Sequence, residues 1–328
     1  VRRGLRLTAR HGVDASSAYF VAGYGLLMCG LGRQLELGVR YGRAGLALAE
    51  RSDGMVRTMV EFAHHGFVRH WGEPLAGTVQ PLLAEFRRGL AVGRGGYAHS
   101  AGAFAALHGL LAGQPLPDVV ELTAELSTEL LRLEEYAFAQ RVAVVAQAAA
   151  DLVGGLDGRE PLCGEQFDAA GWLAARRRRG DLVLIVHTLQ AHVALAHGRL
   201  EDAAGFVAAA APHVRMAPGE VVVGVHHFQA ALLEALGTEG APRSRRSLVA
   251  LRRAAAANPM DHRHRLAMVE AVGSAEHMAA AAVAARDHGH LADHALACLL
   301  VERVAPGGSW RAARAAALHA WGADGVEA

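Results

Sequence analysis

Ten glycines constrain the fold of this chain, because each closes a run of apolar residues at helical spacing. Most intervals between them are either about twenty residues, the length of a helix with its turn, or roughly 34–47, the length of a two-helix repeat. Strand-like alternation is almost absent. The glycines are Gly32, Gly72, Gly93, Gly113, Gly158, Gly180, Gly198, Gly237, Gly289 and Gly322. This pattern predicts a stack of antiparallel helical hairpins.

The expected fold is therefore all-α, a superhelical, tetratricopeptide-like α-solenoid of about 13–15 helices. Two segments read as copies of one turn between helices: His197-Gly198-Arg199-Leu200 and His288-Gly289-His290-Leu291. A glycine in the left-handed conformation ends the first helix of such a turn, and small residues soon after it let the second helix pack closely.

Three further segments show an apolar stripe at steps of three and four residues opposite a polar face, which indicates amphipathic helices. They are 55–71, 75–90 and 119–133. The run Val221-Val222-Val223 is the one strand-like segment, but it follows Pro218-Gly219 and precedes a helical pattern, so we expect a helix to start there.

The helical pattern breaks at Gly154–Glu165, which is rich in glycine and contains Pro161. We interpret this break as a hinge between an N-terminal helical-repeat lobe, 1–157, and a C-terminal one, 158–328. A second break lies at Gly237–Ser247. The chain begins at Val1 rather than Met, and the sequence leaves open whether it is a fragment or uses an alternative start codon.

The charge balance argues against a polyanionic partner, because 33 basic and 32 acidic residues give a net charge of +1. The sequence contains no lysine, which excludes a P-loop lysine, a protein-kinase strand lysine and a Schiff-base lysine. We therefore expect no nucleic-acid partner and no nucleotide chemistry of these kinds.

The expected compartment is the cytoplasm, without membrane insertion. No segment has the roughly 20 uncharged apolar residues of a membrane span, and the amino terminus lacks the apolar core of a signal peptide. Cys29, Cys163 and Cys298 are odd in number and far apart, which supports neither a disulfide framework nor a cysteine zinc site.

The best candidate for a metal site is the series His290, His294 and Cys298, whose steps of four place them on one helical face. Three such ligands span roughly 12 Å along one helix, too far for a single ion. We therefore predict no metal and no cofactor. A metal-dependent all-α enzyme that uses His290 and His294 remains the alternative from the enzyme class.

Other motifs resemble catalytic or binding signatures without their context. Ser100 sits in a near copy of the Gly-x-Ser-x-Gly elbow, but a helix rather than a strand precedes it, and the glycines at 93–96 fail as a dinucleotide loop for the same reason. One Glu-x-x-His motif occurs at Glu61–His64, whereas a di-iron site needs two. Arg176–Arg179 is interpreted as a solvated helix end. We predict no catalytic residues.

Short motifs follow one another along the chain: Tyr24-Gly25 inside the first helix, then Phe67-Val68-Arg69-His70-Trp71 with Pro74-Leu75, and Trp321-Gly322-Ala323 near the end. In their order and spacing these segments resemble the helical-repeat region of large bacterial multidomain signalling proteins. In that family a serine/threonine kinase-like domain and a STAND-type (AAA) predicted ATPase precede the repeats, and GAF and histidine-kinase domains often follow. The resemblance runs through nearly the whole chain. Its signature residues, expected to be structural, are Tyr24, Gly25, Gly38, Trp71, Pro74, Gly113, Pro259, Glu270, Trp321 and Gly322.

The sequence departs from that family's pattern at two places: Gly95-Gly96 stands where Gly-Asp is usual, and Glu270-Ala271-Val272 where Ala-Glu is usual. The resemblance implies a non-catalytic sensor or scaffold segment that binds a protein partner or small ligand and relays to neighbouring domains. Tyr19, Trp172 and Trp310 are the expected contact anchors. The alternative is the ligand-sensing helical domain of a transcription activator.

Overall fold

Every regular element of the described chain is a helix. The computed structural model describes residues 1–14, 16–31, 34–50, 54–91, 95–175, 179–243 and 245–326. Within these ranges there are 17 α-helices and three short 3-10 helices (η), and no strand beyond one isolated bridge between Cys163 and Asp168. The all-α prediction is confirmed, although the expected count of 13–15 helices is too low because short α1 and α9 carry no repeat pattern.

The chain forms two compact units. The first comprises Val1–His108 with Pro218–Val221, and the second comprises Gly109–Ala217 with Val222–Ala328. The boundary that we expected between residues 157 and 158 lies inside the second unit.

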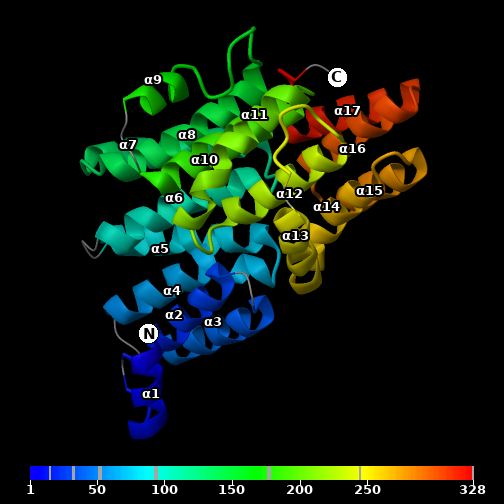
Figure 1. Ribbon diagram of the computed structural model, residues 1–328. Helices are drawn as coiled ribbons and strands as arrows, with labels where there is room; N and C mark the ends of the chain where they lie inside the picture. Colours follow the sequence, from blue (N-terminus) through cyan, green and yellow to red (C-terminus); the bar gives the residue numbers. More distant parts are fainter. Residues whose placement is uncertain are drawn as a thin grey trace. The chain divides into compact units, whose positions relative to one another are not determined.

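The first unit is built from eight helical elements, coloured blue to cyan in Figure 1. They are α1 (Arg2–His11), α2 (Ser17–Gly30), α3 (Leu35–Ala49), α4 (Gly54–Phe67), η1 (Arg69–Trp71), η2 (Leu75–Thr78), α5 (Val79–Ala91) and most of α6 (Gly95–Leu111). The stripes predicted for 55–71 and 75–90 are thus helical; the first ends in a 3-10 helix and the second begins with one.

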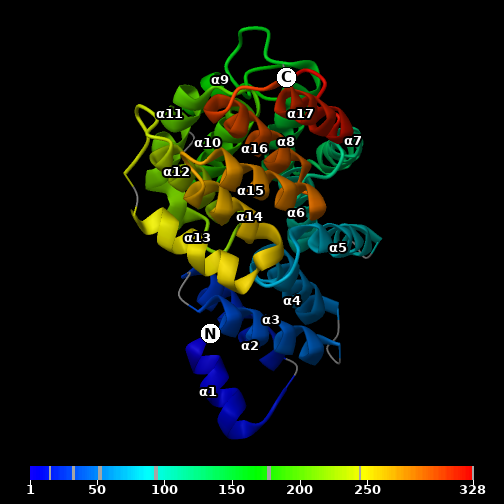
Figure 2. The same cartoon turned by 90° about the vertical axis from the view of Figure 1, so that its right-hand side faces the viewer.

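The second unit contains the remaining helices, and its successive helices α13 to α17 lie side by side in chain order (Figure 2). Its elements are α7 (Leu116–Arg132), α8 (Tyr136–Gly154), α9 (Ala169–Ala174), α10 (Gly180–Ala196), α11 (Leu200–Ala210), η3 (Ala211–Met216), α12 (Val221–Ala235), α13 (Arg245–Ala257), α14 (Pro259–Glu270), α15 (Ala275–Asp287), α16 (Leu291–Val304) and α17 (Gly308–Trp321). The helix that we predicted to start after Pro218-Gly219 is α12.

Helices α2 and α3 cross at glycines. A methyl group on Gly25 would lie 2.7 Å from the carbonyl oxygen of Gly38 and 2.8 Å from the backbone nitrogen of Gly42. Only glycine permits so close an approach of two helix backbones. Gly25 and Gly38, two of the residues on which the resemblance rests, therefore meet at this crossing.

The two turns that looked alike in sequence are alike in structure. Gly198 and Gly289 have φ of 72° and 78°, and each following residue, Arg199 or His290, has φ −85° and ψ 72°. In both turns that following residue donates its backbone N–H to the carbonyl five residues back, at 2.9 Å. This is the glycine-terminated helix end that the sequence predicted.

Other glycines behave differently from our expectation. Gly180 is the first residue of α10 rather than the end of a helix. Gly158 has φ 78° but lies in a loop, because α8 already ends at Gly154. Gly72 follows a 3-10 helix. Gly32 and Gly93, together with Arg176–Arg178, lie outside the described residues.

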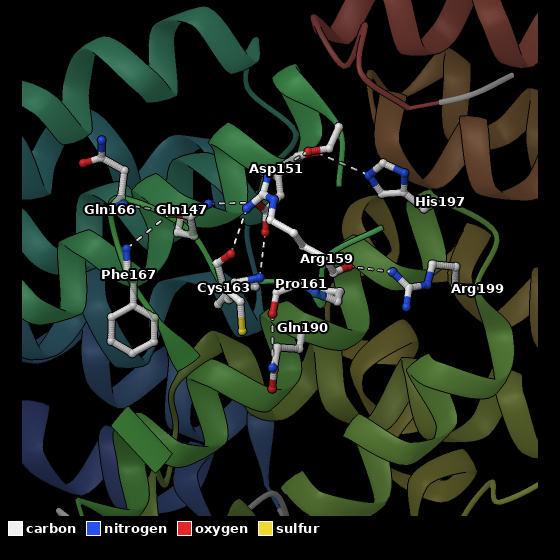
Figure 3. A network of polar contacts seen from close by, with 12 residues as sticks. Gln147, Asp151, Arg159, Pro161, Cys163, Gln166, Phe167, Gln190, His197 and Arg199 are labelled. Atoms are coloured by element: carbon white, nitrogen blue, oxygen red, sulfur yellow. Dashed lines mark hydrogen bonds and ion pairs between the residues drawn. The ribbon is translucent and has the colours of Figure 1, made fainter. Parts of the chain in front are cut away.

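The glycine-rich break at 155–168 is an ordered loop tied to two helices (Figure 3). Asp151 of α8 accepts the backbone N–H of Leu162 at 2.6 Å, and Gln147 of the same helix accepts the backbone N–H of Gln166 at 2.9 Å. Gln190 of α10 donates to the carbonyl oxygen of Pro161 at 3.2 Å. The break is therefore a pinned loop of the second unit.

Candidate functional site

A groove of about 650 Å³ lies between helices α14 and α15 of the second unit. Its volume is in the range of small-ligand sites. The groove is lined mostly by small apolar side chains, with cationic and imidazole groups among them. The lining residues are Pro259, Met260, Arg263, His264, Ala267, Glu270, Ala271, His277, Ala280, Ala281, Ala284 and His288.

Local sequence signals set the starts of both groove helices. The Asn258 side chain caps α14 by accepting the backbone N–H of Asp261, and Pro259 occupies the first helical position, where a backbone N–H is not needed. Ser274 caps α15 by accepting the backbone N–H of His277. The run of alanines 279–282 in α15 then leaves the groove open because these side chains are small.

One wall of the groove is a buried histidine held by a buried ion pair. His264 donates from Nε2 to Asp293 Oδ2 at 2.7 Å, and Arg265 donates from Nε to the same oxygen at 2.7 Å. Burial alone would raise the pKa of the Asp293 carboxyl, but the Arg265 guanidinium and the His264 ring hold it well below its usual value. Asp293 is therefore a carboxylate, and it fixes the His264 ring from behind.

His290 stacks on His264, with ring centroids 4.4 Å apart and planes 25° from parallel. Its Nε2 donates to the carbonyl oxygen of Met260 at 3.1 Å. Burial lowers the pKa of His290, so its ring is neutral near pH 7. The Nδ1 nitrogen of His264 has no hydrogen-bond partner among the described residues.

His264, His290 and Asp293 offer one ligand atom each, and these atoms lie within 4.8 Å of one another, so the three residues are a candidate metal site. The arrangement fits an ion poorly. Arg265 already occupies the Asp293 oxygen, and its positive charge would oppose a cation there. The two rings are stacked almost in parallel, whereas ligands of one tetrahedral ion converge on a point from directions about 109° apart. We interpret the trio as a hydrogen-bonded ion-pair network.

The other histidine of the enzyme alternative, His294, faces a different partner from that of His290. Its Nδ1 donates to the carbonyl oxygen of Ala282 at 2.8 Å. Cys298 Sγ lies 3.7 Å from that nitrogen, and burial raises the pKa of the thiol to about 11, so it is not a thiolate at neutral pH. In the part of the chain that the structure describes, neither residue belongs to a three-ligand group.

The remaining motifs lie on helices without catalytic geometry. Ser100 is inside α6, where its hydroxyl donates to the Gly96 carbonyl oxygen at 3.0 Å. His64 of the Glu61–His64 motif is buried in α4, and burial lowers its pKa to about 3. Of the three expected aromatic anchors, Tyr19 is exposed, whereas Trp172 and Trp310 are half-buried.

The residues on which the resemblance rests fall on both units, and of these only Pro259 and Glu270 line the groove. Trp71 donates its indole N–H to the Gly219 carbonyl oxygen at 3.2 Å in the first unit. In the second unit, Gly322 has φ 84° at the end of α17.

Sequence reasoning missed most of the groove. Arg263, His264, His277 and His288 were not singled out as a set. A usable signal was present, because α15 combines a run of alanines with histidines at its two ends, and small residues beside polar ones favour an open cleft.

Comparisons with family models, with curated proteins and with solved structures return no match for this chain. Within the described residues, no helix combines the length and apolar character that crossing a membrane requires.

Proposed function

We propose that this chain is a non-catalytic helical-repeat module that receives a ligand or a protein segment in the groove between α14 and α15. The groove is the observation that carries the proposal, because it joins a ligand-sized volume to a rigid polar wall at His264. Helical-repeat stacks use such surfaces for binding. The repeated turns at Gly198 and Gly289 support the view that the helices form a superhelical stack of antiparallel hairpins.

In this proposal the module belongs to a cytoplasmic bacterial signalling protein with ATPase and kinase domains, as the resemblance implies. Occupation of the groove favours one arrangement of α14 to α16, and that preference passes to the neighbouring domains. Catalysis then resides outside this chain, which agrees with its lack of lysine.

The test compares the full chain with two variants of α15. Ala280→Phe places a ring in the groove from an exposed lining position, whereas Val283→Phe adds a similar ring at an exposed position outside the groove. Each protein is incubated with a bacterial cell extract and analysed by native mass spectrometry. We expect retained species whose occupancy falls at least tenfold in Ala280→Phe and is unchanged in Val283→Phe.

An identical set of retained species in all three proteins would contradict the assignment of binding to this groove. The non-catalytic part is tested separately with the same purified chain. Robust ATP hydrolysis or autophosphorylation would contradict it.

A further inference from the structure

We infer that the groove between α14 and α15 takes an organic anion with an apolar body, a small amphipathic acid. This inference rests on the proposed function and names the chemical class of its ligand. It follows from three features of the groove: its charge, its floor and its wall.

The groove presents a positive charge to a ligand, because the Glu270 carboxylate is paired with a cation and the Arg263 guanidinium is not. Glu270, the one acidic lining residue, is paired with Arg252 of α13 at 3.0 Å. Arg263 is exposed and makes no ion pair with any described residue. A guanidinium forms charge-assisted hydrogen bonds to carboxylate, sulfonate or phosphate oxygens, often two at a time.

The floor is apolar and made of small side chains, chiefly Ala267, Ala271, Ala281 and Ala284 with Met260 beside them. Such a surface binds the hydrocarbon part of a ligand by removing it from water. A small inorganic anion would leave this surface uncovered. The floor therefore favours an amphipathic acid over a bare anion.

The wall supplies one imidazole nitrogen that is available to a ligand, the Nε2 of His288. His264 is buried and fixed through Nε2, and its Nδ1, which is unpartnered among the described residues, is buried as well, so this ring shapes the wall and makes no polar contact with a ligand. His288 donates from Nδ1 to the Ala284 carbonyl oxygen at 2.7 Å, which leaves its Nε2 for another group. The His288 Nε2 is suited to a polar substituent of a ligand whose acid group binds Arg263.

The test uses two fluorescent probes that share an aromatic body and differ in charge. One is 1-anilinonaphthalene-8-sulfonate, an anion, and the other is N-phenyl-1-naphthylamine, which is neutral. We expect one anionic probe per chain at saturation. Arg263→Gln should weaken the anionic probe at least tenfold and change the neutral probe less than twofold, while Ala280→Phe should abolish binding of both.

Two control variants distinguish probe binding in the groove from probe binding elsewhere on the surface. Arg246→Gln removes an exposed charge from α13 outside the groove, and Val283→Phe adds a ring outside it; both should leave the two affinities unchanged. Far-ultraviolet circular dichroism and thermal melting of each variant exclude probe binding to unfolded chain.

Equal affinity of the anionic probe for Arg263→Gln and the native chain would overturn the inference and leave the proposed function standing. Probe binding that is absent, or that survives Ala280→Phe, would also overturn it. The native mass spectrometry experiment then distinguishes the two proposals. If species from the cell extract still bind the native chain and are lost in Ala280→Phe, the groove binds another molecule or a protein segment, and only the ligand class proposed here is wrong.

Discussion

Trp321 donates its indole N–H to the carbonyl oxygen of Gln114 at 3.0 Å, across 207 residues of sequence. The Trp321 side chain is fully buried and meets the His192 ring edge to face. This bond joins the last helix of the second unit to the turn before its first. A side-chain hydrogen bond thus connects the two ends of the second unit.

Trp321→Phe tests this connection. The substitution removes the donor, leaves the part-buried Gln114 oxygen without this partner and opens a small cavity around the buried ring, so the free energy of unfolding should fall by about 1–3 kcal/mol. The control is Trp172→Phe, because the Trp172 indole nitrogen has no hydrogen-bond partner among the described residues. Chemical denaturation of the full chain measures both, and equal losses would contradict a specific role for the bond.

Gly25→Ala should destabilise the first unit, because the new methyl group would press on the backbone of α3 at Gly38 and Gly42. Gly23→Ala on the same helix is the matched control. A methyl group there has its nearest neighbour at 3.5 Å, and replacing glycine by alanine inside a helix favours folding by up to about 1 kcal/mol. Thermal melting should therefore move in opposite directions for the two variants. A shift in the same direction for both would refute the close crossing.

Local features of this fold could be predicted from the sequence, whereas contacts between distant segments could not. The turns at Gly198 and Gly289 were predictable because a helix end is a local event, determined by residues within one turn of the glycine. The pairing of Gly25 with Gly38 was less evident, since it depends on which helices cross. The Trp321 bond to Gln114 and the His264 contact with Asp293 were beyond reach, because the partners are distant in sequence and meet only after the helices pack.

The loop at 155–168 illustrates a misleading local signal. Its glycines and proline are typical of a linker, and we expected a hinge there. The residues that hold it in place, Gln147 of α8 and Gln190 of α10, lie outside the loop, and neither carries a turn signal. The composition of a loop therefore predicts its conformational freedom poorly when buried polar side chains of neighbouring helices hydrogen-bond to its backbone N–H and C=O groups.

Asp151→Ala should release this loop. The substitution removes the acceptor for the Leu162 N–H and for the Gln147 amide, which donates to Asp151 at 2.8 Å. We expect cleavage within 155–168 by a nonspecific protease to accelerate at least tenfold. Glu165→Ala, at an exposed position of the same loop, should leave the cleavage rate unchanged. Equal protection of Asp151→Ala and the native chain would show that the loop is held by other contacts.

Asp293→Ala should be among the most destabilising single changes in the second unit. It leaves the buried Arg265 guanidinium without its partner, and breaking a buried ion pair from one side costs about 3–5 kcal/mol. The double variant Asp293→Leu with Arg265→Leu should recover much of that loss, because no buried charge remains. Asp287→Ala, which breaks the exposed pair with Arg286, should cost less than about 1 kcal/mol. Denaturant unfolding checks all three, and a double variant no more stable than the single one would argue against an ion-pair origin.

Buried histidines should make the protein sensitive to acid. Burial lowers the pKa of His192 to about 4, whereas an unfolded histidine has a pKa near 6.5. Well above pH 6.5 neither state is protonated at this ring. As the pH falls from about 6.5 to 4, the unfolded chain binds a proton that the folded chain does not, so the free energy of unfolding decreases by up to about 1.4 kcal/mol per pH unit for each such histidine.

The His192→Phe variant isolates this effect in the second unit. The ring shape beside Trp321 is retained, and His192 Nε2 has no hydrogen-bond partner among the described residues to lose. Stability measured by urea unfolding at pH 7.5 and pH 5.0 should then differ less in His192→Phe than in the native chain. His319→Phe serves as the control because its side chain is 83% exposed, and it should keep the native difference. If His192→Phe shows the same loss of stability as the native chain between these pH values, His192 is not a source of the acid sensitivity.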